Sequence, residues 1–444
     1  MYPKRVWSLW LSLALSLAVG FTRRGQRRFV ELVTGLALNV EEHTITQALV
    51  GLDRPQDWKA LESFAEYGSW NLPLSQRNIG WVIGQLPNAL WYGYRVWAGD
   101  DTKVHRNSEN VWGTCTFHEY NARCPNRAQT VRAHNWVVVG GLLPTLDQPA
   151  TFLPAAGRLY FRKSQLPVGE TFRTKNELLV DMLWQQAGAE EERHLAVFDG
   201  AFAVGNVVRR LVRPEAGRPR IEFVTRLRCD ARLCALPLPR REHQRGPTPK
   251  WGRPLSPPQQ GGRWPAEWQN GKTFIYGRCR EVRWKEVICL WRVLGHEDSV
   301  KAVVAEVEGY SERFSLVASA LELTGLQVVE LFCARFRQED GFRDLKQRLG
   351  WEECRAWTKN PIERTTQALF TTLTLLRLLQ RRLQEQVGDD WWLHPPWNNH
   401  KTRPSVLDAE RLLRQNRDGI QQCLSEWLET CGKTDGIDPP KPPP

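Results

Sequence analysis

The sequence lacks the patterns that most directly identify a metal scaffold or a common enzyme class. Its 10 cysteines include no Cys-x2-Cys pair, and the Cys-x2-His spacing of Cys115 and His118 has no second pair, so a zinc framework is not indicated. We find no phosphate-binding glycine loop, no Ser-His-Asp order and no internal repeat. A chain of 444 residues with this composition does not need a disulfide framework, so we expect reduced, buried thiols.

The sequence also lacks an apolar run long enough to span a membrane. Residues 6–21 form a run of 16 residues, whereas a membrane helix needs about 20. Together with the basic start MYPKR, this run mimics a secretory signal. The basic stretch TRRGQRR that follows it, and the missing disulfide pattern, favour a buried helix in a cytoplasmic protein over an exported one, so we expect no membrane partner.

The charge is strongly positive and unevenly distributed. The formal net charge is +12, which favours an anionic partner such as DNA. Residues 205–260 contain thirteen Arg or Lys against four Asp or Glu. Trp284 and Trp291 follow this stretch and could stack on a displaced base, although burial in the core is the simpler expectation. A second basic cluster, which either grips DNA or forms a solvated surface, consists of Arg23, Arg24, Arg27 and Arg28.

Hydrophobic patterning predicts an α/β fold in five segments. Residues 1–90 are predicted to be a helical DNA-binding domain, and residues 91–228 alternate strand and helix signals, as in a sheet with helices on its faces. Residues 229–312 combine a basic, Pro-rich loop with β hairpins. Residues 313–385 contain a strand, a charged helix and a long apolar helix. Residues 386–444 are predicted to be a helical region that ends in a disordered Pro-rich tail.

One predicted helix, from Gly325 to Gly350, carries an unusual charged stripe. At about 100° per residue, Phe332, Arg335, Glu339 and Lys346 fall within roughly 60° of arc. A core helix would show Leu and Val at these positions. An acid, two cations and an aromatic side chain on one face suit the binding of a metal beside a phosphate backbone.

Two further acids end predicted strands: Asp100 in GYRVWAGDDT and Asp199 in RHLAVFDG. Mg²⁺ prefers oxygen ligands, and three carboxylates from separate elements, with Glu339 as the third, are enough to hold two such ions. Taken singly, each acid has an ordinary explanation as a turn, a helix cap or a solvated face. Their combination on a basic chain favours metal-dependent chemistry on DNA.

These residues resemble the motifs of the DDE transposases of bacterial insertion sequences, and in particular the cut-and-paste group with a Tyr-x2-Arg-x3-Glu-x6-Lys signature. The stretch LFCARFRQEDGFRDLKQRLGWEECRAW is the most specific part, and Phe332 stands where the group has Tyr. GDDT and VFDGAF are similar to the two Asp motifs. The first motif selects Asp100, with its neighbour Asp101 as the alternative.

The resemblance implies an RNase H-like catalytic core that is interrupted by a mostly β insertion between Asp199 and Glu339. It implies a transposase that cuts DNA at the element ends and joins the 3′-hydroxyls to target DNA, using Mg²⁺ or Mn²⁺ as a substitute. We further expect a homodimer in a synaptic complex and a bacterial, nucleoid-associated location. The basic insertion would contact the element end, with DNA contacts from Arg240, Arg241 and Arg245, besides Phe332, Arg335 and Lys346.

Two other functions fit the same residues. One is an RNase H-like nuclease that cuts without strand transfer. The other is a non-catalytic DNA-binding protein derived from a transposon, which the full set of three acids disfavours.

Overall fold

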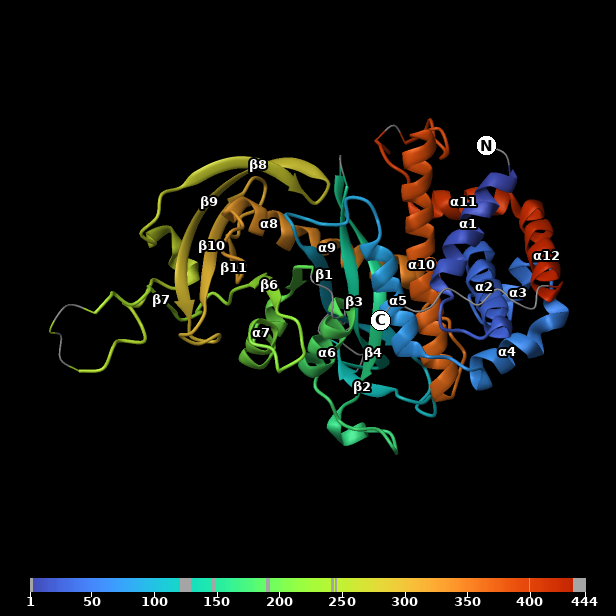
Figure 1. Cartoon of the computed structure of the whole chain (residues 1–444), viewed down its shortest axis with the longest axis horizontal. Coiled ribbons are helices and arrows are strands. Elements are labelled where there is room, and N and C mark those ends of the chain that lie inside the picture. The colour runs from blue at the N-terminus through green and yellow to red at the C-terminus, as the bar shows by residue number, and fades with distance from the viewer. Residues whose placement is uncertain are drawn as a thin grey trace.

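The computed structural model describes residues 3–119, 129–145, 148–188, 192–240, 243, 246–398 and 400–433. A large mixed sheet occupies one half of the molecule and a group of helices the other (Figure 1). The helices are α1 (Pro3–Leu17), α2 (Arg23–Leu38), α3 (Gln47–Gly51), α4 (Trp58–Tyr67), α5 (Leu72–Gly84), α6 (Lys175–Ala187), α7 (Gly205–Val212), α8 (Gly325–Ala334), α9 (Phe336–Gln347), α10 (Lys359–Val387), α11 (Val406–Gln415) and α12 (Arg417–Lys433).

The strands form one sheet with the order β2-β3-β1-β5-β6-β11-β10-β9-β7, while β4 pairs with β3 and β8 with β9. β1 runs parallel to β5, and β5 runs parallel to β6; the other pairs are antiparallel. The strands are β1 (Arg95–His105), β2 (Cys115–His118), β3 (Thr130–Thr145), β4 (Gln148–Tyr160), β5 (His194–Phe198), β6 (Ile221–Arg226), β7 (Leu233–Cys234), β8 (Gln269–Ile275), β9 (Arg278–Trp291), β10 (Ser299–Val307) and β11 (Phe314–Ala318).

Helices cover both faces of the sheet. α6 packs on β1, β3 and β4, and α7 packs on β6, whereas α8 and α9 pack on the opposite face. Side chains of a strand alternate between faces, and β1 follows this rule: a Cβ on Gly99 would meet Leu179 of α6, while the next residue, Asp100, contacts Arg335 beside α9. Both faces of the centre of the sheet are therefore buried. Helix α6, which covers one of them, begins with a capping box between Thr174 and Glu177.

The N-terminal and C-terminal helices form one helical half. Trp7 of α1 donates a hydrogen bond to the carbonyl of Asn416, and Arg414 of α11 donates to the carbonyl of Asn39. α10 lies between these helices and the sheet (Figure 1), and its Gln367 side chain donates to the carbonyl of Ala155 on β4. Residues predicted as two separate regions, 1–90 and 386–444, thus share a core.

The expected buried helix at residues 6–21 corresponds to α1, although the helix ends earlier, at Leu17. One face of the helix is buried, including Trp7, Trp10 and Leu17, and its other leucines are partly buried. Within the described residues, we find no helix whose length and apolar character would let it cross a membrane. The Pro-rich tail lies outside the described residues.

The segment predicted as a β insertion extends the main sheet. Its strands β7 to β10 continue outward from β11 (Figure 1). A long arm follows β7 (Figure 1), and a backbone hydrogen bond between Ala235 and Arg253 joins the two ends of this arm. Trp284 and Trp291 are buried, with 6% and 2% exposure, so the proposed stacking of either ring on a DNA base is wrong for this conformation. Both rings pack into the sheet core because their strands are covered by other elements.

The prediction of a single helix from Gly325 to Gly350 is also wrong. The chain forms two helices, α8 and α9, that meet at Arg335. The backbone of Arg335 stays in the right-handed helical region, but the hydrogen bonds on either side of it span three residues, from Arg335 N to Phe332 O and from Gln338 N to Arg335 O. No Pro marks this break in the sequence. It lies where the chain passes from the outer strands onto β1 and β4.

Candidate active site

Two of the predicted acids lie side by side, but only Asp199 follows the end of its strand. The prediction that Asp100 ends a strand is wrong, because β1 stays paired with β3 through Asp100 as far as His105. β1 and β5 are parallel and in register up to the pair Gly99 and Phe198, so the next residues, Asp100 and Asp199, stand side by side. Burial, helped by the negative charges of Asp101 and Asp199, raises the pKa of Asp100 to about 6 against the opposing effect of the Arg335 charge. The carboxylate of Asp199 makes no hydrogen bond or ion pair to any residue that the structure describes.

Asp101, the alternative to Asp100, points to the other face of the sheet. Its carboxylate accepts a hydrogen bond of 2.6 Å from Lys175 at the start of α6. This ion pair fastens α6 to β1. Asp101 is therefore held on the opposite side of the strand from Arg335.

The third acid, Glu339, is connected to Asp100 by ion pairs with the same residue, Arg335. One guanidinium nitrogen of Arg335 lies 2.8 Å from Asp100, and another lies 3.5 Å from Glu339. Glu339 is one turn along α9, and 46% of its side chain is exposed. α9 is anchored on β3, because the buried amide of Gln338 donates to the carbonyl of Val138 at 3.0 Å. The structure thus gathers Asp100, Arg335 and Glu339 into one cluster.

The other two members of the stripe lie at the edges of this cluster. The ring of Phe332 lies 5.7 Å from the guanidinium of Arg335, which is a cation–π distance. The ammonium of Lys346 donates to the carbonyl of Lys103, three residues beyond Asp100, and lies 3.9 Å from Glu352. Burial lowers the pKa of Lys346. This lysine contacts β1 beyond the acids and forms no ion pair with them.

The donors suit a hard divalent cation, since all three acids offer oxygen. In the described part of the chain, however, no group of three His, Cys, Asp or Glu side chains stands close enough to hold one ion in this conformation. Arg335 lies between Asp100 and Glu339 and neutralises part of their charge. Its Nε is buried without a hydrogen-bond partner among the described residues.

Many of the basic residues counted in the sequence are already paired with acids. In and after α7, Arg210 lies 3.6 Å from Asp181, and Arg213 pairs with Asp298. In α2, the fully buried Glu31 binds Arg27, Arg28 and Arg54. The positive surplus therefore contributes less free charge than the sequence suggested.

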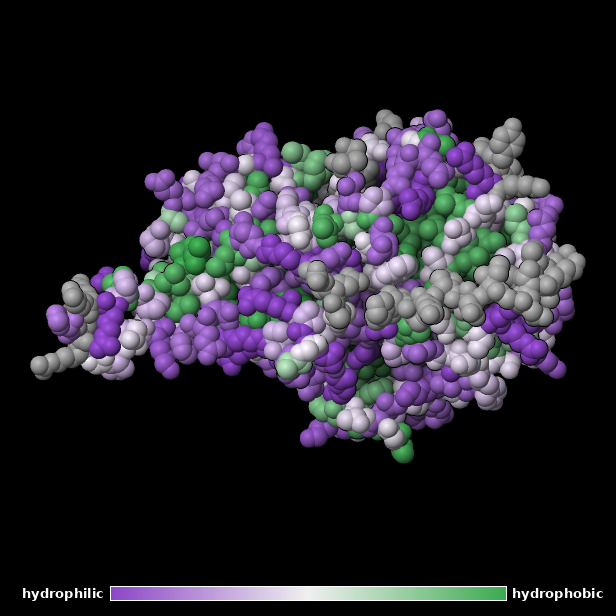
Figure 2. Space-filling view, in the orientation of Figure 1, coloured by the Kyte–Doolittle hydropathy of each residue, from purple (hydrophilic) through white to green (hydrophobic). Residues whose placement is uncertain are grey.

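Three of the predicted DNA contacts, Arg240, Arg241 and Arg245, belong in sequence to the segment between Ala235 and Arg253, the arm. Arg240 is exposed on it, whereas Arg241 and Arg245 lie outside the described residues. Hydrophilic residues prevail on the face of the molecule shown in Figure 2, including the region of α6 and α7.

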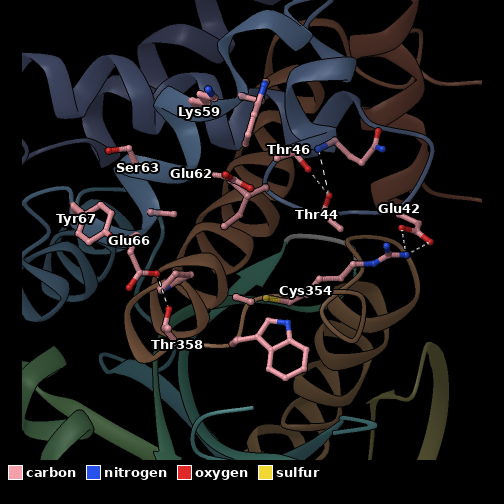
Figure 3. Close-up of a pocket in the computed structure, with 18 residues that line it drawn as sticks. Glu42, Thr44, Thr46, Lys59, Glu62, Ser63, Glu66, Tyr67, Cys354 and Thr358 are labelled. Carbon is pink, nitrogen blue, oxygen red and sulfur yellow. Dashed lines mark hydrogen bonds and ion pairs between the residues drawn. The ribbon is translucent and has the colours of Figure 1, made fainter. Parts of the chain in front are cut away.

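Two large cavities differ in their relation to the acids. One, of about 960 Å³, opens beside Asp199 and is lined by Arg226, Glu312 and Arg313, none of which the sequence had indicated. The position of Arg226 at the end of a predicted strand, next to the strand of Asp199, was the available signal. The other cavity, of about 690 Å³, lies between α4 and the segment that follows α9 (Figure 3). None of the three acids borders this second cavity.

The α/β structure places two carboxylates on adjacent parallel strands, with an arginine beside one of them, an arrangement that is compatible with metal-dependent cleavage of phosphodiesters. The chain belongs to the family described as DDE superfamily endonuclease, whose model matches residues 16–288, more than half of the sequence. The match includes Asp100 and Asp199 and ends before Arg335 and Glu339. No curated protein matches the chain. Membership indicates a nuclease-type enzyme with DNA as its substrate and a divalent metal ion as its cofactor.

Proposed function

We propose that the protein is a DNA transposase that cuts DNA at insertion-sequence ends and joins the resulting 3′-hydroxyls to target DNA. The observation that carries this proposal is the pairing of Arg335 with both Asp100 and Glu339, together with Asp199 on the parallel strand next to Asp100. The family membership supports it, since the two Asp residues fall within the matched segment.

Asp100, Asp199 and Glu339 would hold two Mg²⁺ ions, with Mn²⁺ as a substitute. Two bound ions supply a water-derived nucleophile and stabilise the leaving oxygen of the phosphodiester. The raised pKa of Asp100 and the unpaired carboxylate of Asp199 support this role, because both carboxylates gain from a nearby cation. Arg335 would then exchange its carboxylate partners for a phosphate oxygen, and its unpartnered Nε gives it a further donor.

The spacing of Phe332, Arg335, Glu339 and Lys346 supports membership of the cut-and-paste group. Phe332 lacks the hydroxyl of the group's Tyr, which could bond DNA, while the carboxylates are unaffected. The pairing of β1, antiparallel to β3 and parallel to β5, supports an RNase H-like core. We propose that α2 and the arm contact DNA and that two copies act together in a synaptic complex, in a bacterial cytoplasm at the nucleoid.

The alternative function is an RNase H-like nuclease that stops after cleavage. The non-catalytic DNA-binding protein is disfavoured, because a binding protein has no need of a buried carboxylate beside an unpaired one. Arg335 and the acids are compatible with both cleavage and joining, so the distinction requires an assay.

The test uses duplexes that carry the inverted repeats flanking the gene. The protein with Mg²⁺ should cut them at the element end, and a pre-cut end with a free 3′-hydroxyl should be joined to a plasmid. Asp199→Asn should abolish both reactions and leave binding in EDTA intact. Cutting without joining would favour the nuclease, and full activity of Asp199→Asn would refute the proposed site.

A further inference from the structure

The cavity beside Asp199 is a groove between two elements of the sheet. One wall is the end of β6 and the residues that follow it, and the other is the turn between β10 and β11. β5 and β6 are parallel, with Phe198 opposite Thr225, so Asp199 and Arg226 follow at adjacent strand ends. A Cβ placed on Gly200 would lie 3.6 Å from the Cβ of Arg226. The groove therefore begins at the candidate active site.

Three arginines line this groove, and each of them forms an ion pair with an acid. Arg226 lies 3.6 Å from Glu312, Arg228 lies 3.1 Å from Asp230, and Arg313 lies 2.7 Å from Glu306. The pair of Arg226 and Glu312 connects the two walls. These two side chains are 51% and 83% exposed, so water screens their attraction and little free energy opposes their separation.

The acids in the groove affect how strongly the groove can bind a polyanion such as DNA. A phosphate oxygen can replace a carboxylate on an arginine with similar geometry. While Glu312 is in place, however, its charge competes with the phosphate for Arg226 and repels it. An exposed acid at this position therefore weakens phosphate binding in the groove without blocking the groove sterically.

We propose that this groove takes the phosphate backbone of the DNA strand that leaves the active site, and that Glu312 competes with this strand for Arg226. This inference rests on the proposed function, since it takes the acids to be the cleavage site. Arg226 is a positioning residue that acts on a phosphate next to the reacting one. Glu312 sets how readily Arg226 becomes available.

The experiment compares the wild type with Arg226→Ala, Glu312→Gln and the double variant. Each is titrated with salt while bound to a labelled element-end duplex in EDTA, so that cleavage plays no part. Arg226→Ala should weaken binding and reduce the log–log salt slope by about one unit, because one phosphate contact is lost. Glu312→Gln should tighten binding roughly two- to fivefold, the range expected for removing a competing exposed pair.

The double variant tests whether the two residues act on each other. Glu312→Gln should tighten binding less in the absence of Arg226, because only its direct repulsion of the phosphate is then removed. Glu215→Gln is the matched control, since Glu215 is exposed, does not line the groove and makes the same change in net charge. An equal gain from Glu215→Gln, or the same gain from Glu312→Gln in both backgrounds, would overturn the proposal.

A native thiol reports the position of the strand. Cys229 is exposed and lines the groove, so bound duplex should slow its alkylation in the wild type and slow it less in Arg226→Ala. Cys423 on α12 is the reference thiol. If the duplex is bound and cut but Cys229 is not protected, the groove assignment fails while the transposase proposal stands. If the duplex is not bound at all, both fail.

Discussion

The guanidinium of Arg335 lies 2.8 Å from the carboxylate of Asp100, although 235 positions separate the two residues in the chain. The contact joins the junction of α8 and α9 to the central strand β1. It also selects one side of that strand, because Asp101 faces Lys175 on the other side. We make five predictions. Four concern the candidate site and the arginines proposed to bind DNA, and the fifth concerns a buried acid in the helical half.

Asp100 and Asp101 should differ sharply when each is replaced by Asn. Loss of a residue that only supports a metal ligand already costs 10- to 100-fold, so Asp100→Asn should lower cleavage by about 100-fold or more. Asp101→Asn should keep most activity, since it loses only a partly exposed ion pair with Lys175. The measurement is single-turnover cleavage of an end duplex. The reverse order of effects would place the metal on the other face of β1.

Replacing Arg335 with Gln should move the acid limb of the pH–rate profile to higher pH. The positive charge of Arg335 lowers the pKa of Asp100, which burial has raised to about 6. Without that charge the pKa rises further, so Asp100 ionises only at higher pH. The matched control is Lys175→Gln on the opposite face, which should leave the limb in place. An acid limb that is the same in Arg335→Gln and wild type would show that Asp100 does not govern it.

Two arginines of α2 should have different roles. Arg24 is exposed, whereas Arg28 lies 2.8 Å from the buried Glu31. Arg28→Ala should lower the free energy of unfolding by about 1 kcal/mol, because Arg27 and Arg54 still hold the acid. Arg24→Ala should leave stability unchanged and reduce the salt slope of DNA binding by about one unit. If binding by Arg24→Ala equals that of wild type, this end of α2 is only a solvated surface.

Replacing Arg240, Arg241 and Arg245 with Ala should weaken binding of the element-end duplex. If all three contact phosphate, the log–log salt slope should flatten by about two to three units, since each contact releases nearly one counterion. Alanine at Arg213, which pairs with Asp298, is the control for general loss of charge. An unchanged slope in the triple variant would show that these arginines belong to a solvated loop.

Glu410→Gln should change how stability depends on pH. Burial raises the pKa of Glu410 to about 7, despite the opposing charge of Arg414. A folded-state pKa above the unfolded value means that protonation stabilises the fold, and this stabilisation is lost as pH rises from about 4.5 to about 7. The loss should amount to at most about 3 kcal/mol. Denaturant unfolding at pH 5 to 8 should therefore show a decline in wild type relative to Glu410→Gln, and parallel curves would contradict this assignment.

The elements themselves were largely predictable from local pattern. Strand alternation and helical periodicity are visible within a few residues, so β5, β6 and α6 were expected close to where they occur, whereas β1 runs on to His105. Asp199 after β5 was visible for the same reason, but the position of Asp100 within β1 was not. The break at Arg335 was not, because neither Pro nor Gly marks it and the change in hydrogen bonding coincides with long-range packing.

The sequence by itself determined which chemical groups are present: three acids on separate elements, an arginine one helical turn before Glu339, and an excess of positive charge. The tertiary structure decided which of these groups meet. It turned Asp100 toward Arg335 and Asp101 toward Lys175, paired many of the arginines with acids, and placed Arg226 beside Asp199. Local sequence sets the alternation of a strand, but only the packing of helices on each face determines what a side chain contacts.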